Sequence, residues 1–330
     1  MLPNWLYGKS KSKLQEILGG GGGGTSYTAG DGIDISNGVI SFDPATTPAI
    51  DPSKVDGLDL AALAPKTALS NANILHNPWF TVNQRGATTV SESGVYFVDR
   101  WKTSINTVVS QSYTLSNGIL TMDNTSGSTS IYLLQKCETS VKEALRGKTV
   151  TASVLLSDGT ILNGTREFPG VYINTKDLMV YSNDGNSEIL TIEVKKGKTV
   201  SFKALKLELG SVSTLAMDTA PDMALELAKC QRYFQRISGS NNDYLGLACF
   251  LSTTEAYTCL AIPSLMRTTP TLTYNGNFKI AGGNAISAIS LLNLTGNLAS
   301  LKCVSSGLPQ SGLARIQFSA NGYIDFNAEL

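Results

Sequence analysis

The sequence predicts a mainly β protein in which short antiparallel strands form a sandwich or a barrel. Asn-Gly steps begin at residues 37, 117, 163, 275 and 321, and Asp-Gly steps at residues 31, 56, 158 and 184. Many are flanked by alternating apolar residues, which is the strongest short-range signal for a β-hairpin. The composition agrees, because 42% of the 330 residues are hydrophobic and only 16% are charged. Ser, Thr, Asn and Gly fill much of the remainder, which suits short strands and turns.

The charge balance argues against two classes of partner. The chain carries 26 basic and 26 acidic side chains, and its pI is near 6.6. A nucleic-acid-binding protein or a polybasic membrane-surface protein carries excess positive charge. The N-terminus does not resemble a signal peptide, and the chain contains no 18-residue apolar run. We therefore expect no nucleic acid, no membrane insertion and synthesis in a cytoplasm.

Histidine and cysteine usage predicts neither a metal site nor a cofactor. The single histidine, His76, excludes two-histidine metal signatures, and its place before Asn77-Pro78 favours a structural role at a turn. The five cysteines at 137, 230, 249, 259 and 303 form no C-x-x-C pair. We expect them to be buried, reduced thiols.

The first 24 residues predict a docking tip on a tether. An aromatic and apolar tip is followed by a short helix whose apolar residues share one face, and six glycines at 19–24 then give the chain its greatest backbone freedom. Helices this short are marginal in water, so the segment needs a docking surface. The candidate docking residues are Leu2, Trp5, Leu6, Tyr7, Leu14 and Ile17.

Residues 25–72 predict a stalk. With Asn37-Gly38 as a two-residue turn, Ile35 faces Ile40 and Ile33 faces Phe42 on one side of a hairpin. A lone two-stranded hairpin cannot bury that side, so we expect it to pack on copies of itself or on another protein. Prolines at 44, 48, 52 and 65 then indicate an extended spacer.

From residue 73 onward the pattern is β, interrupted by one helix. Hairpins are predicted within 113–122, 150–162 and 178–194, and a final hairpin around residues 314–326. Residues 221–237 predict an amphipathic helix with an apolar stripe at 4-3-4-3 spacing. The stripe suits a face packed on the core, with a coiled-coil seam as the open alternative.

Chemical motifs predict binding more readily than catalysis. The G-K-[S/T] fragments lack the glycine that begins a phosphate-binding loop, and no G-x-S-x-G elbow occurs. We expect no catalytic residues, although a pair of distal carboxylates could still serve a glycosidase. Trp79 and Trp101 are expected in the core, with Asp99-Arg100 as an internal ion pair or backbone clamp. The candidate ligand-binding residues are tyrosines near distal turns, namely Tyr244, Tyr257, Tyr274 and Tyr323.

Five stretches of the chain, the first two within one segment of residues 73–101, stand in an order that resembles one family. Residues 77–86 read N-P-W-F-T-V-N-Q-R-G and residues 96–101 read Y-F-V-D-R-W. K-L-E-L-G follows at 206–210, C-Q-R-Y-F at 230–234 and I-D-F-N-A-E-L at 324–330. This order, over roughly 260 residues, is similar to that in fibre proteins of tailed phages and prophages.

The resemblance implies a jelly-roll, carbohydrate-binding-like sandwich in a fibrous homotrimer of the virion. The N-terminus would attach to another virion protein, of the tail or the capsid, and the C-terminal end would face the host. The resemblance supplies no shared catalytic or sugar-contacting residue, and it implies that the Q-R-G and D-R-W motifs lie in the sandwich core. The expected parts are a tip and tether (1–24), a stalk (25–72), the jelly-roll domain with its closing helix (73–237) and a sandwich-like distal β domain (238–330).

Residues and resemblance together lead to one functional hypothesis. We expect a tail fibre or receptor-binding protein that attaches the virion to a host surface polysaccharide or another receptor. A purely structural head fibre or capsid decoration protein is one alternative, and a polysaccharide depolymerase is another.

Overall fold

The computed structural model describes residues 33–36, 39–42, 54–55, 58–59, 70–105, 111–183, 187–219, 221–280 and 283–330. The chain divides into two compact units, Met1–Pro65 and Lys66–Leu330. Antiparallel strands make up most of the described residues, so the prediction of a mainly β protein is confirmed.

The first unit contains two short antiparallel pairs of strands. Strand β1 (Ile33–Ser36) pairs with β2 (Val39–Phe42), and β3 (Lys54–Val55) pairs with β4 (Leu58–Asp59). The first pair has the predicted register, in which Ile33 faces Phe42 and Ile35 faces Ile40. The predicted docking residues and the glycine tether lie outside the described residues.

The second unit begins with a sandwich of two six-stranded antiparallel sheets. The three hairpins predicted for this region are confirmed as β8–β9, β11–β12 and β14–β15. In spatial order the first sheet contains β13 (Val171–Asn174), β14 (Leu178–Tyr181), β15 (Glu188–Val194), β10 (Ile131–Lys136), β7 (Trp101–Ile105) and β6 (Tyr96–Val98). The second contains β12 (Ile161–Glu167), β11 (Thr149–Leu156), β16 (Thr199–Leu209), β9 (Ile119–Asp123), β8 (Ser112–Ser116) and β5 (Thr89–Val90). A short helix, α2 (Thr139–Leu145), follows β10.

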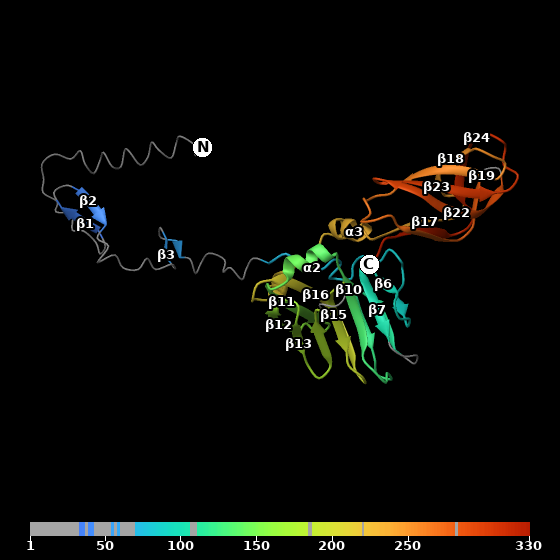
Figure 1. Cartoon of the computed structure of the whole chain (residues 1–330). Coiled ribbons are helices and arrows are strands. Elements are labelled where there is room, and N and C mark those ends of the chain that lie inside the picture. The colour runs from blue at the N-terminus through green and yellow to red at the C-terminus, as the bar shows by residue number, and fades with distance from the viewer. Residues whose placement is uncertain are drawn as a thin grey trace. The chain divides into compact units, whose positions relative to one another are not determined.

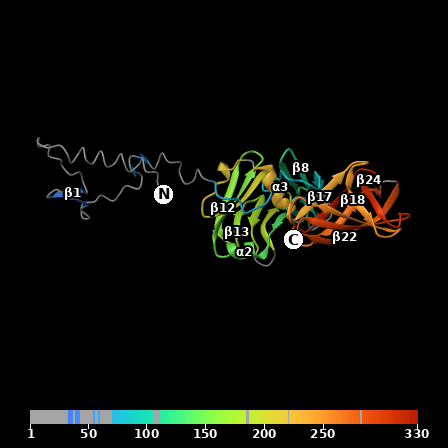
Figure 2. The ribbon, with the colours of Figure 1, turned by 90° about the horizontal axis from the view of Figure 1, so that it is seen from above.

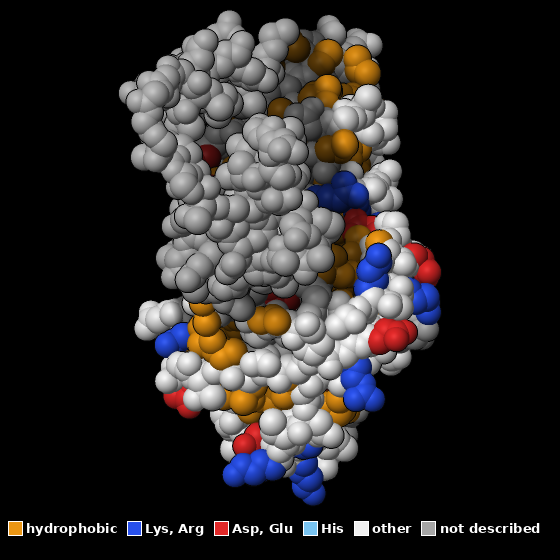
Figure 3. Space-filling model, turned by 90° about the vertical axis from the view of Figure 1, so that its left-hand side faces the viewer, with side chains coloured by type: hydrophobic (Ala, Val, Ile, Leu, Met, Phe, Trp, Pro, Cys, Tyr) orange, Lys and Arg blue, Asp and Glu red, His pale blue; other side chains and the backbone are white. Residues whose placement is uncertain are grey.

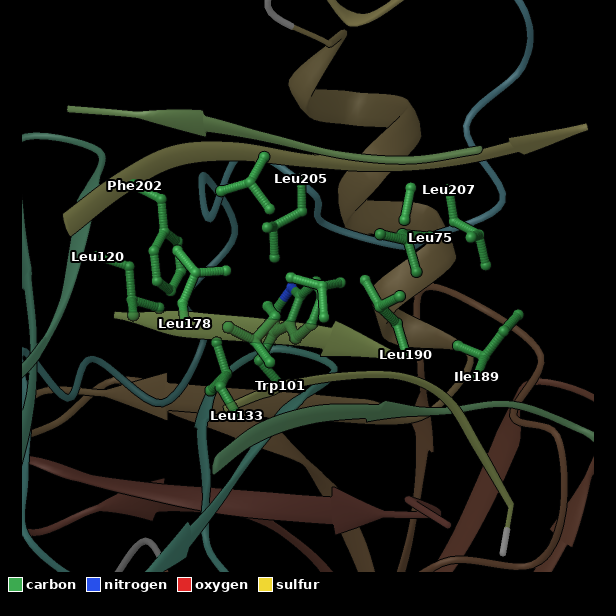
Figure 4. Packing of buried hydrophobic residues seen from close by; sticks show 14 of the residues in the cluster. Leu75, Trp101, Leu120, Leu133, Leu178, Ile189, Leu190, Phe202, Leu205 and Leu207 are labelled. Atoms are coloured by element: carbon green, nitrogen blue, oxygen red, sulfur yellow. The ribbon is translucent and has the colours of Figure 1, made fainter. Parts of the chain in front are cut away.

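Side chains from both sheets form one apolar core. In Figure 4, Phe202 and Leu205 of β16 point toward Leu133 and Leu178 of the opposite sheet, with Trp101 between them. Alternate residues of each strand face this core, because successive side chains of a strand point to opposite sides. Trp101 is fully buried, as predicted, whereas Trp79 is only half-buried.

The helix after the sandwich is shorter than predicted. Helix α3 (Met223–Gln231) begins at Asp222, whose side chain accepts hydrogen bonds from the backbone N–H groups of Ala224 and Leu225. It ends at Gln231, so the prediction of a helix through residue 237 is wrong. Phe234 instead begins strand β17 (Phe234–Gly239), which pairs with the last strand of the chain. The apolar stripe therefore continues into a sheet and does not form a coiled-coil seam.

The distal module is a closed barrel beside a small sheet, and not the sandwich-like module that was predicted. Around the barrel lie β18 (Tyr244–Phe250), β19 (Glu255–Ala261), β23 (Leu298–Ser305), β22 (Asn284–Thr295), β21 (Phe278–Ile280) and β24 (Gly312–Phe318). The small sheet contains β17, β25 (Gly322–Asn327) and β20 (Thr271–Asn275). A short 3-10 turn, η2 (Leu215–Met217), precedes α3.

The predicted final hairpin is also wrong. Strand β24 pairs with β18 and β21 in the barrel, whereas β25 pairs with β17 and β20 in the small sheet. Closure of the barrel explains the separation, since it gives β24 two partners and leaves no free edge. Gly276, with a φ of +99°, joins β20 to β21, and a Cβ there would lie 2.7 Å from the Gly322 Cα. Glycine thus permits the two chain segments to cross closely.

Sandwich and barrel flank α3 and β17. Figure 1 shows the strands of the sandwich in turquoise, green and olive and those of the barrel in orange and red, with α3 between them. The view from above in Figure 2 shows the same separation. Within the described part of the chain, no helix has the length and apolar character needed to cross a membrane.

The sandwich core predicts that replacing two leucines of β16 by alanine changes the free energy of unfolding by very different amounts. Leu207 is fully buried and Leu209 is 49% exposed. Leu207→Ala is expected to lower the free energy of unfolding by about 2–5 kcal/mol, because it leaves a cavity. Leu209→Ala is expected to change it by less than about 0.5 kcal/mol. Urea denaturation of both variants measures this, and equal losses would contradict the assignment of the core.

Candidate functional site

Four of the five sequence motifs meet in a buried ionic network where the sandwich contacts β17 and the C-terminal residues. Arg85 donates to Asp99 at 2.9 Å and lies 3.5 Å from a carboxylate oxygen of Glu329. Its guanidinium also stacks on the Phe234 ring, 3.6 Å from the centroid. Gln84 donates to Asp99 at 2.6 Å and to the Phe234 carbonyl at 2.9 Å. We call Arg85, Asp99, Arg100, Tyr233 and Glu329 the junction network.

Arg100 is the most deeply buried cation of this network. It is 1% exposed, donates to Glu329 and to the Lys136 carbonyl, and stacks 3.4 Å from the centroid of the Tyr233 ring. Asp99 and Arg100 were predicted to form an internal ion pair or a backbone clamp. Asp99 pairs instead with Arg85, and Arg100 pairs with Glu329, so both residues form internal ion pairs but not with each other. A positive φ of 73° at Arg100 marks the turn between β6 and β7 where the two side chains diverge.

Backbone contacts complete the junction. Asn77 is fully buried and donates to the carbonyls of Val82 and Asp99, while its own carbonyl accepts from the Trp101 indole. Glu226 of α3 accepts from the Asn77 N–H at 2.8 Å. Buried polar groups of this kind need such partners, because an unpaired one loses its hydrogen bonds to water. The motifs of the first half of the chain are therefore bound to α3 and to the last residues.

A second buried ionic cluster contains the K-L-E-L-G stretch. Lys206 is fully buried and donates to Asp218 and Ser70, each at 2.6 Å. Glu208, also fully buried, accepts from the N–H and the hydroxyl of Thr214. These contacts hold the segment after β16, and Ser70, against the sandwich.

Burial shifts the pKa of two groups, one in the junction network and one beside it. Desolvation raises the pKa of Asp99 to about 6, against the opposing influence of the Arg85 charge and the Gln84 hydrogen bond. Desolvation, with the charge of Arg100, lowers the pKa of His76 to about 4. His76 is therefore neutral at pH 7, and its Nδ1 has no hydrogen-bond partner among the described residues. This fits the structural role predicted from the sequence.

An open cleft lies beside the junction network and has a volume of about 460 Å³. One wall comes from the sandwich, around Arg85, Glu92 and Tyr96, and the other from the small sheet. We call it the junction cleft. Its lining comprises Arg85, Ala87, Val90, Glu92, Gly94, Val95, Tyr96, Phe97, Phe234, Arg236, Thr273, Asp325 and Asn327.

The wall from the small sheet is polar because its strands alternate. Ile324 and Phe326 of β25 point into the barrel core, so Asp325 and Asn327 point the other way. Arg236 of β17 makes two hydrogen bonds of 2.7 Å to the Asp325 carboxylate and stacks 3.6 Å from the centroid of the Tyr323 ring. Such bidentate pairs hold both side chains in fixed geometry. The cleft thus presents a rigid polar face.

Aromatic rings distinguish this cleft from another on the sandwich. A second hollow, around Asp158, Lys176 and Asp177, is lined by no aromatic side chain. The junction cleft is lined by Tyr96, whose hydroxyl donates to the Leu330 carbonyl at 2.7 Å, and by Phe97 and Phe234. Only the junction cleft of these two therefore combines polar groups with rings.

The structure places the four predicted tyrosines on four different strands, β18, β19, β20 and β25. Tyr244 and Tyr257 lie on strands of the barrel, where Tyr244 accepts from Arg315 and Tyr257 donates to Glu255. Tyr274 of β20 packs edge-on against Phe278. Tyr323 lies beneath Arg236, next to the junction cleft.

Sequence reasoning missed Arg236, Thr273, Asp325 and Asn327. Their signal was polar residues alternating with apolar ones in three strands, β17, β20 and β25. The first of these strands was hidden within the predicted helix, so the common polar face could not be recognised.

The surface away from the junction cleft carries charges of both signs. On the face drawn in Figure 3, basic and acidic side chains are interspersed over the described residues. Among the described residues, no group of three or more His, Cys, Asp or Glu side chains could hold a metal ion.

Comparison with known proteins gives no relative. No protein-family model matches the chain, and neither a curated protein nor a solved structure matches it.

The junction network predicts that replacing two acidic side chains by alanine lowers the free energy of unfolding by different amounts. The Glu329 side chain is 3% exposed, so Glu329→Ala leaves Arg100 charged and buried without its carboxylate. We expect the free energy of unfolding to fall by about 3–5 kcal/mol. Glu143, paired with Arg146 on the surface, is the control, and Glu143→Ala is expected to cost less than about 0.5 kcal/mol. Chemical denaturation measures both, and a similar small loss for the two variants would refute the network's role.

His76 predicts a loss of stability in acid. Its folded pKa of about 4 lies below its ordinary 6.5, so between these values the unfolded chain binds a proton that the folded chain does not. This contribution is fully present above pH 6.5 and disappears as the pH falls toward 4, by at most about 3 kcal/mol. Since it is the only histidine, NMR of its ring reports its state directly. An imidazolium signal from the folded protein at pH 6 would contradict this.

Proposed function

We propose that this protein is a fibre protein of a tailed-phage virion that binds a glycan on the host surface. In this proposal the chain forms a homotrimer, its first residues attach to a tail or capsid protein, and a jelly-roll sandwich carries the distal module toward the host. The ordered motifs that resemble phage fibre proteins support the proposal, as does the junction cleft.

The geometry of the junction cleft is the single observation that favours glycan binding. Sugars expose hydroxyl groups around a ring with apolar faces, so they are bound by fixed polar side chains beside aromatic or apolar surfaces. The cleft provides Asp325, Asn327 and Thr273 on one wall and Tyr96 on the other. Because the chain has no net charge, a neutral glycan fits it better than a strongly acidic one.

We propose binding in preference to cleavage. Both oxygens of the Asp325 carboxylate accept hydrogen bonds from Arg236. Such a pair fixes the carboxylate in position and occupies both of its oxygens, whereas a catalytic acid must be free to deliver a proton to the substrate. Each site would be weak, and several copies per virion would raise the avidity by about 10² to 10⁴.

The proposal predicts loss of binding when the cleft is filled. Thr273 is exposed and lines the cleft, so Thr273→Arg is expected to obstruct it without disturbing the core. We expect binding of the purified protein to host cells, or to their extracted polysaccharide, to fall at least about tenfold.

A matched variant controls for the added charge. Thr160, in the exposed turn between β11 and β12, does not line the cleft, and Thr160→Arg is expected to bind as the wild type does. Equal binding by all three proteins would refute the cleft as the site. Absence of binding by the wild type would favour the structural fibre, and release of reducing ends would favour the depolymerase.

A further inference from the structure

The outer wall of the barrel exposes large apolar side chains over adjacent strands. Leu313 of β24 is 68% exposed, Leu247 of β18 is 58% exposed, and Leu292 of β22 is 54% exposed. Leu251, directly after β18, is 67% exposed. A soluble monomer rarely exposes a contiguous apolar patch of this kind, and larger ones mark interaction sites.

Strand register makes these residues neighbours. Leu313 pairs with Cys249, and Cys249 pairs with Tyr257 on the next strand. Cys259 of the same strand faces Ser300, and both line one shallow depression with the leucines. We call the lining residues the barrel wall, namely Leu247, Cys249, Leu251, Tyr257, Thr258, Cys259, Leu292, Ser300, Leu301 and Leu313.

The barrel does not need these leucines for its own core. Ala248, Phe250 and Ile316 fill the interior from the alternate positions of β18 and β24. Outward positions of a barrel strand ordinarily carry polar side chains, since they face water. The apolar wall therefore requires a covering surface outside this barrel.

The barrel is nearly free of charge. From residue 244 to residue 318 there are five charged side chains, namely Glu255, Arg267, Lys279, Lys302 and Arg315. Glu255 and Lys302 pair with each other at 2.5 Å, whereas Arg315, opposite Leu247 in the β18–β24 pair, adds a positive charge beside the wall. The residues that line the wall itself are all uncharged, so the lining offers no charge to complement an acidic or a basic partner. Two copies of the chain can meet through this uncharged lining without placing like charges face to face.

We propose that the barrel wall is the surface through which copies of this chain contact one another. The closed barrel has no free strand edge, so association through this module must use its side chains. This inference deepens the homotrimer of the proposed function by naming a contact surface, and it does not depend on glycan binding in the junction cleft.

Two native thiols provide the test. The prediction of buried cysteines is wrong for Cys249 and Cys259, which are free and exposed in the single chain and line the barrel wall. The full-length protein is treated with a maleimide under non-denaturing conditions, modification of each cysteine is followed by mass spectrometry, and molar mass is measured by light scattering. Leu313→Glu places a charge in the wall at an exposed position. Leu225→Glu, at a 57% exposed position of α3, is the matched control.

In the wild type and in Leu225→Glu we expect an oligomer whose two thiols react at least about tenfold more slowly than in Leu313→Glu. Circular dichroism should show the same strand content in all three proteins. Should the stalk hold the oligomer together in Leu313→Glu, faster thiol modification still supports the inference.

A monomeric wild type with freely reacting thiols would overturn the inference, and so would an oligomer whose thiols react as fast as those of Leu313→Glu. A monomeric wild type with freely reacting thiols is also the result expected if a host protein, absent from the purified sample, covers the wall, so that case counts against the inference as well. Glycan binding is measured separately on Leu313→Glu, which should keep its single-site affinity. Failure of one proposal is thus distinguishable from failure of the other.

Discussion

The buried pairing of Arg100 with Glu329 is the constraint on which the junction depends. Moving a guanidinium and a carboxylate out of water is costly, and their attraction compensates only when the geometry is good and the remaining groups are hydrogen-bonded. Here the Lys136 carbonyl and the Tyr233 ring complete the surroundings of Arg100, while Arg85 provides a second cation beside Glu329. The pair joins two residues that are 229 positions apart in the chain.

This constraint explains why a cleft exists beside the network. The junction cleft takes one wall from the sandwich and the other from the small sheet, so its shape depends on how firmly the two are joined. Arg236 extends the junction by donating to the Arg85 carbonyl at 2.7 Å while it pairs with Asp325. Preorganised polar groups bind a ligand with a smaller loss of conformational entropy than mobile ones. A firm junction would therefore favour ligand binding in the proposed glycan site, because it holds the lining of the cleft in a fixed geometry.

Local turn chemistry made part of the fold predictable. The Asn37-Gly38 turn predicted the register of β1 and β2, and the Asn117-Gly118 turn predicted the β8–β9 hairpin. Long-range pairing decided the rest. Phe234 is a strand residue because β25 provides its backbone partners, and Asn321-Gly322 joins strands of two different sheets. In the site, the motif around Arg85 was recognisable, but its partner Glu329 is brought near only by the complete fold.

The central claim is that Arg100 and Glu329 stabilise the protein as a coupled pair, and a double-mutant cycle tests it most directly. The free energies of unfolding of Arg100→Met, Glu329→Gln and the combined variant are compared with that of the wild type. We expect a coupling energy of about 1.5–3 kcal/mol, because the combined variant leaves no unpaired buried charge. Additive losses, with a coupling energy near zero, would show that the two residues act independently and would contradict the account.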